Sequence, residues 1–160
     1  DAVPLRDPML LQAHANRTAY RALLEGEPAL ARLREQQLPR GDFGRGVGYT
    51  ARWGEFIVGF SYIWEGQILL ADSFLRPAVA SAEADLGRRN RFSCMLAALL
   101  AAAAWECDRP HDATALLADR IDILERSGVA ESPRLAYRTM ARSPTADCSP
   151  TFSPYIRVSP

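Results

Sequence analysis

The residues best suited to chemistry lie close together around position 110. Cys107 and His111 are four positions apart, so a helix would bring both side chains to one face, as a zinc site or a nucleophile–base pair requires. Structural zinc takes four ligands, however, and the only other histidine, His14, is remote in the sequence. Asp108 and Pro110 are typical of a helix start. We therefore expect no metal, no cofactor and no catalytic residue, and we interpret the chain as a non-enzyme.

Two other segments carry residues that bind phosphate or acidic groups in many proteins. The glycine-rich stretch 41–48 precedes a predicted helix, but the third glycine of a dinucleotide fingerprint would fall at Tyr49, and no strand precedes it. We interpret it as a flexible connection. Arg88, Arg89 and Arg91 could hold an acidic partner. They follow a predicted helix end, so we expect a solvated loop there.

The composition excludes several classes of function. All 19 basic residues are arginine, so a P-loop and lysine Schiff-base chemistry are excluded within this chain. The 19 acidic residues bring the net charge to zero, which argues against direct contact with nucleic acid or an anionic membrane. The three cysteines are interpreted as free thiols. The longest apolar run, 95–105, is too short to span a bilayer, and we expect a cytoplasmic location.

A stripe of large apolar residues is the strongest candidate for a binding surface. Its members recur at the spacing of one helix face, and residues of a later helix extend it. They are Trp53, Phe56, Phe60, Ile63 and Trp64, followed by Met95 and Trp105. Such a face either lines a groove for an effector or a partner helix, or packs between neighbouring helices. The residues alone leave both interpretations open.

Helical periodicity accounts for most of the chain. Apolar residues recur at helical spacing in segments that end at Gly, Pro or Asp, and these segments predict helices. The predicted helices span 8–25, 27–37, 49–64, 68–86, 91–106, 110–126 and 133–142. The tail 143–160 has four Ser-Pro dipeptides and no helical period, so we expect irregular chain there. The prediction is one helical domain, 1–142, followed by this tail.

Markers along the chain repeat with a period of about forty residues. Gly26, Gly66 and Asp108 each end an apolar segment, and they lie 40 and 42 residues apart. Each is followed five positions later by an alanine, and Gly87 and Gly128 mark a second series 41 residues apart. This period is typical of stacked helical hairpins. We therefore predict an all-α fold: a TPR-like α-solenoid of antiparallel hairpins with about 40–42 residues per repeat.

Small and large residues alternate as in tetratricopeptide repeats, with Val58-Gly59, Gly66 and Ala71 in one unit and Leu100-Ala101 in the next. The longer unit resembles the helical-repeat region of the large LuxR-type (MalT-like) bacterial transcriptional regulators. The stretches that carry this resemblance are 69–83, 95–106, 116–128 and 135–142, within a similarity that covers residues 10–142. In that family the region lies between a nucleotide-binding module and a helix-turn-helix. The resemblance implies a scaffold and assigns no residue of this chain to ATP or DNA.

Together these observations predict a non-catalytic sensor or protein-interaction segment of a LuxR-type transcriptional regulator. Its expected partner is a protein or a small-molecule effector on the concave face, and DNA would be reached only through a module outside this chain. A stand-alone adaptor that binds a peptide or an amphipathic helix in the same groove is the alternative. The exposed ends of a solenoid also offer a surface for self-association.

Overall fold

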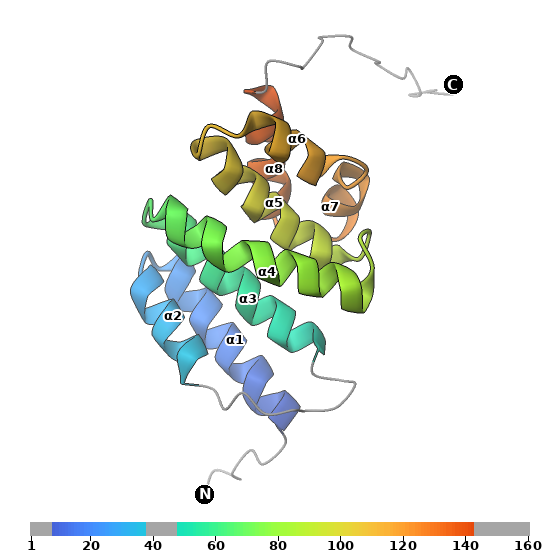
Figure 1. The fold of residues 1–160 in the computed structure, drawn as a ribbon. Helices are drawn as coiled ribbons and strands as arrows, with labels where there is room; N and C mark the ends of the chain where they lie inside the picture. The colour runs from blue at the N-terminus through green and yellow to red at the C-terminus, as the bar shows by residue number, and fades with distance from the viewer. Residues whose placement is uncertain (1–7, 38–47, 143–160) are drawn as a thin grey trace, which may run out of the picture.

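The computed structural model describes residues 8–37 and 48–142, and every regular element in these segments is an α-helix (Figure 1). The helices are α1 (Pro8–Leu24), α2 (Pro28–Gln36), α3 (Gly48–Trp64), α4 (Ile68–Leu86), α5 (Arg91–Glu106), α6 (Pro110–Leu117), α7 (Ile121–Ser127) and α8 (Glu131–Ala141). The all-helical prediction is confirmed for these residues. The glycine-rich segment 41–47 and the tail 143–160 lie outside them.

Three turns between helices share one geometry, and the repeat markers of the sequence occupy them. Gly26, Gly66 and Asp108 have positive φ angles of 85°, 73° and 57°. In each turn the marker N–H donates to the carbonyl three residues earlier, and the following N–H donates to the carbonyl five residues before it. This pair of bonds is the Schellman motif, which satisfies the last carbonyls of a helix. The chain therefore reverses in the same way between α1 and α2, α3 and α4, and α5 and α6.

Small residues allow the paired helices to pack closely. The alanines that follow the three turns, Ala31, Ala71 and Ala113, have no exposed surface. The central helix is α5, in which every residue from Phe92 to Ala104 is buried. It packs against α3, α4, α6, α7 and α8. A helix surrounded in this way needs short side chains on several sides, and the alanine run 101–104 provides them.

The helix pairs follow one another in space as they do in the sequence (Figure 1). Both α1 and α2 pack on α3, both α3 and α4 pack on α5, and α5, α6 and α7 pack on α8. A side-chain hydrogen bond joins α1 to α8: the Tyr20 hydroxyl donates to Glu131 Oε2 at 3.0 Å. The packing of α1, α3, α5 and α8 therefore brings the first and last of these helices within hydrogen-bond distance of each other.

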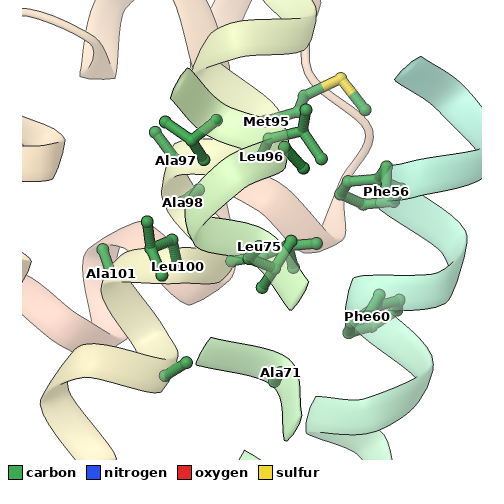
Figure 2. Packing of buried hydrophobic residues seen from close by; sticks show 14 of the residues in the cluster. Phe56, Phe60, Ala71, Leu75, Met95, Leu96, Ala97, Ala98, Leu100 and Ala101 are labelled. Atoms are coloured by element: carbon green, nitrogen blue, oxygen red, sulfur yellow. The ribbon is translucent and has the colours of Figure 1, made fainter. Parts of the chain in front are cut away.

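The core between the second and third helix pairs combines aromatic and aliphatic side chains. Phe56 and Phe60 of α3 face Leu75 of α4 and Met95 and Leu96 of α5 (Figure 2). All five side chains are buried. Burial of this kind contributes about 1.5–3 kcal/mol per large side chain, so this contact helps to hold the two pairs together.

The predicted helix 110–126 is wrong as a single element, because α6 ends at Leu117 and α7 begins at Ile121. Between them Asp119 has a φ of 61°. The turn directs Arg120 into the interior, where its side chain is fully buried and pairs with Glu83 of α4. Its Nη1 also donates to the Ser93 carbonyl at 3.2 Å. The buried ion pair thus accompanies a break that the local sequence does not signal.

The arginines predicted to lie in a solvated loop have partners at this break. Arg88 donates to the carbonyls of Ala115 and Ala118 at 3.1 and 3.4 Å. Arg89 donates to the Asp119 carbonyl and pairs with the Asp122 carboxylate at 2.8 Å. Carbonyls at a helix end lack partners within the helix, and cations near them are favourable. Arg88 and Arg89 therefore cap α6, so the expectation of a loop without partners is wrong for these two exposed residues, whereas Arg91 forms no hydrogen bond or ion pair with a described residue.

Candidate binding site

A continuous line of aromatic rings runs along α3. Tyr20 of α1 lies 5.3 Å from Trp53, and Trp53 stacks on Phe56 with centroids also 5.3 Å apart. Phe60 follows at 5.9 Å from Phe56, and Trp64 contacts Phe60 edge-on at 5.5 Å. Ring pairs at these separations add about 0.5–1.5 kcal/mol each beyond the area they bury.

The structure divides the predicted groove residues into a buried floor and partly exposed ends. Phe56, Phe60 and Met95 are at most 6% exposed, so they pack inside the protein. Trp64 is 49% exposed, and Trp53, Ile63 and Trp105 are half-buried. An occupant of this surface would therefore contact the ends of the stripe, with the buried residues holding those ends in place.

A hollow of about 390 Å³ opens at one end of the stripe, beside Trp53. Residues of α1, α3 and α5 surround it, together with one residue that precedes α8. The lining residues are Ala13, Asn16, Arg17, Tyr20, Tyr49, Thr50, Trp53, Arg91, Phe92 and Val129. Of these, the sequence identified two: Trp53 as part of the aromatic stripe and Arg91 as a candidate to hold an acidic partner. Tyr20, Tyr49 and Phe92 belong to three different helices, so no spacing along the chain connects them.

Two arginines give the hollow its charge. Arg17 and Arg91 are exposed, and neither forms a hydrogen bond or ion pair with another described residue. The Arg91 guanidinium lies over the Phe92 ring, 4.6 Å from the ring centroid. Burial and the bond to Glu131 raise the pKa of Tyr20 to about 12, so this hydroxyl keeps its proton at neutral pH. The hollow therefore combines aromatic walls with positive charge.

A smaller hollow of about 280 Å³ lies where α3, α5 and α8 end. Ile63 and Trp105 of the predicted site line it, together with Leu135, Arg138 and Arg142 from α8 and its end. Six of the seven predicted residues are thus divided between two hollows and the packed floor between them, and the exposed Trp64 lines neither hollow. The sequence did not identify the α8 residues of this hollow. The periodicity of that helix shows which of its residues share a face, but not which other helices that face meets.

The candidate nucleophile near position 110 is poorly suited to that role. Burial, Asp72 and Glu106 raise the pKa of the Cys107 thiol, so it is protonated at neutral pH, whereas nucleophilic cysteines need a lowered pKa. Cys94 is buried, and its burial likewise raises its pKa. Within residues 8–37 and 48–142, no three His, Cys, Asp or Glu side chains are grouped to hold a metal ion.

Comparison of the chain with protein-family models, with curated proteins and with solved structures gave no match. Among the helices that the structure describes, none combines the length and the apolar character needed to cross a membrane.

Proposed function

We propose that this chain is a non-catalytic helical-repeat module that binds a small amphipathic anion in the hollow between Tyr20, Trp53 and Phe92. The observation that carries the proposal is the composition of that hollow: aromatic walls with two arginines that have no partner among the described residues. Its volume of about 390 Å³ is in the range of small-molecule sites. The apolar part of an aromatic or aliphatic carboxylate would pack on the rings, and its carboxylate would pair with the arginines.

The arrangement of the helices supports a short solenoid as the scaffold of this site. Three helix pairs closed by the same turn pack in sequence order, which is how repeat proteins stack. In such a stack α1, α3, α5 and α8 line the concave side, and the Tyr20–Glu131 bond accords with strong curvature there. The hollow then lies on the concave face, where repeat proteins bind their partners.

Tyr20 offers a route by which an occupant would be sensed. Its ring lines the hollow, and its hydroxyl holds Glu131 at the start of α8. An anion close to that hydroxyl competes with the Glu131 carboxylate for the hydrogen bond that the hydroxyl donates. Binding would therefore loosen the link between the first and last helices and change the curvature of the stack. In a LuxR-type regulator, this change would be relayed to modules outside the chain.

A fluorescence titration tests the binding step. Trp64→Phe and Trp105→Phe leave Trp53 as the single tryptophan, and cinnamate is compared with cinnamyl alcohol, which is neutral. We expect cinnamate to change Trp53 emission with an affinity about tenfold higher than that of the alcohol, because one charged hydrogen bond is worth about 1.5–3 kcal/mol. Arg91→Gln should remove this preference, whereas Arg21→Gln, at an exposed arginine outside the hollow, should keep it. Equal affinity for acid and alcohol contradicts the proposal.

The adaptor interpretation is favoured by one observation, the presence of hollows at both ends of the aromatic stripe. An extended acidic peptide could place one side chain in each. In that case binding of the peptide would be weakened both by Arg91→Gln at one hollow and by Arg138→Gln at the other. A small effector depends on the first substitution alone, so the two variants separate the two functions.

A further inference from the structure

A second cavity lies on the opposite side of α3. This groove of about 750 Å³ runs between α2 and α4. Its lining residues are Gln12, Glu35, Gln36, Ala51, Gly54, Glu55, Val58, Tyr62, Ser73, Phe74, Pro77, Ala78 and Ser81. Tyr62 and Phe74 form a tilted ring pair with centroids 6.0 Å apart, and they give the groove an aromatic wall. None of these residues lines the hollow at Trp53.

Glu35 stands out in this groove because its carboxylate has no partner among the residues that the structure describes. Its Oε1 is buried without a hydrogen bond, and its Oε2 occupies the space that a side chain on Gly54 would fill. The nearby Asn16 amide donates to the Thr50 carbonyl at 2.7 Å and accepts from Gln12 at 2.9 Å. The absence of a side chain at position 54 thus lets a carboxyl group lie against α3.

The arginines closest along α2 and α3 are committed elsewhere. Arg34, the neighbour of Glu35 on α2, donates to the Thr18 carbonyl at 2.6 Å. Arg52 pairs with Glu55 at 2.9 Å and with Asp85 at 2.5 Å, and Arg32 pairs with Glu65 at 2.6 Å. The groove lining therefore holds two carboxylates, of which only Glu55 is paired, and no cationic side chain. A buried charge is costly unless an opposite charge or hydrogen-bond donors satisfy it. Within residues 8–37 and 48–142, no cation pairs with the Glu35 carboxylate.

We propose that the α2–α4 groove binds an organic cation, a primary ammonium carried on an apolar body, with Glu35 as its counter-ion. The ammonium would pair with the Glu35 carboxylate beside Gly54. The body would lie along Val58, Pro77 and the Tyr62–Phe74 wall, where apolar and aromatic surface is available. This site is distinct from the proposed anion site, because the lining residues and the sign of the charge both differ.

The site should respond to pH in a defined direction. Burial raises the pKa of Glu35 from 4.5 to about 7, so its carboxyl is partly protonated at neutral pH. Around it, α1 presents the neutral Gln12, α3 presents Glu55 paired with Arg52, and α4 adds no charged side chain to the groove. An ammonium ion binds the ionised form only. Its affinity should therefore rise about tenfold between about pH 6 and about pH 8.

Phenethylamine is a suitable probe, and phenethyl alcohol is its neutral counterpart. Titration of the ¹⁵N-labelled 160-residue chain, followed by NMR, gives the affinity of the probe. A shift of the Gly54 amide signal shows that the probe binds in this groove. We expect the amine to shift that amide and to bind at least about tenfold more tightly than the alcohol. Glu35→Gln should abolish the preference and the pH dependence. It should also fold, since it removes an unpaired buried charge.

Two further variants make the test specific. Glu27→Gln changes an exposed carboxylate just before α2 and should leave amine binding unchanged. Gly54→Ala should weaken binding because its methyl group would displace the Glu35 carboxylate. The proposal is overturned if amine and alcohol bind equally, if Glu35→Gln retains the affinity of the wild type, or if the Gly54 amide does not move at millimolar amine.

Discussion

Replacement of Gly66 by alanine tests whether the turns between paired helices set the repeat. Gly66 has a φ of 73°, and a Cβ there would meet no atom within 4 Å. Any loss of stability must therefore come from the backbone. The left-handed conformation costs a non-glycine residue about 1–2 kcal/mol. Alanine has less conformational freedom than glycine in the unfolded chain, which stabilises the folded state by about 0.4–1 kcal/mol. The free energy of unfolding should therefore fall by about 1 kcal/mol.

Urea denaturation followed by circular dichroism measures this loss. With a slope of about 2 kcal/mol per molar urea, the midpoint should fall by about 0.5 M. Gly26→Ala should give the same shift, because Gly26 has a φ of 85° and equally open surroundings. Gln67→Ala is the control: Gln67 is exposed with a φ of −81°, and its side chain forms no capping bond. If Gly66→Ala is as stable as the control, the shared-turn argument is refuted.

The remaining predictions concern the core and the buried charges, with Leu69→Ala as an exposed control. Leu75→Ala should lower the free energy of unfolding by about 3 kcal/mol, whereas Leu69→Ala, at a 78% exposed residue, should change it by less than about 0.5 kcal/mol. Arg120→Ala should cost about 3 kcal/mol in the same urea assay, because it leaves Glu83 and the Ser93 carbonyl without their buried partner. Glu35 has a higher pKa folded than unfolded, so protonation favours the folded state. Stability should therefore fall as the pH rises from about 4.5 to about 7, and urea midpoints of Glu35→Gln should lack this slope.

The helices and the hairpin turns were accessible from the sequence because their signals are local. An apolar period, a glycine that permits positive φ and a small residue five positions later all lie within a few residues of the feature they specify. Even Asp108, which replaces glycine in the third turn, adopts the same backbone conformation. The second series of markers was less informative: Gly87 has a φ of 88°, but Gly128 has a φ of −74°.

The features that the sequence did not reveal depend on contacts between distant residues. The break before Arg120 accompanies its pairing with Glu83, 37 residues earlier, and nothing in the segment 116–122 opposes a continuous helix. Likewise, the aromatic stripe was identified, but its division into floor and ends depends on how α4 and α5 cover it. Periodicity shows that residues share a face, and only packing shows how much of that face remains open.

The position of α3 connects the two proposed sites physically. Its Trp53 side lines the anion hollow, and the neighbouring Gly54 lies in the cation groove. Arg52, only 9% exposed, fastens this part of α3 to α4 through Ser81 at 2.8 Å and Asp85. Phe56, one turn further along α3, packs in the core that joins it to α5. A rotation of α3 would therefore disturb both sites together, and α1 adds a second link, because Gln12 in the groove donates to Asn16 in the hollow at 2.9 Å. Occupants of the two sites would thus influence each other through these two helices and through the Arg52 contacts that restrain α3.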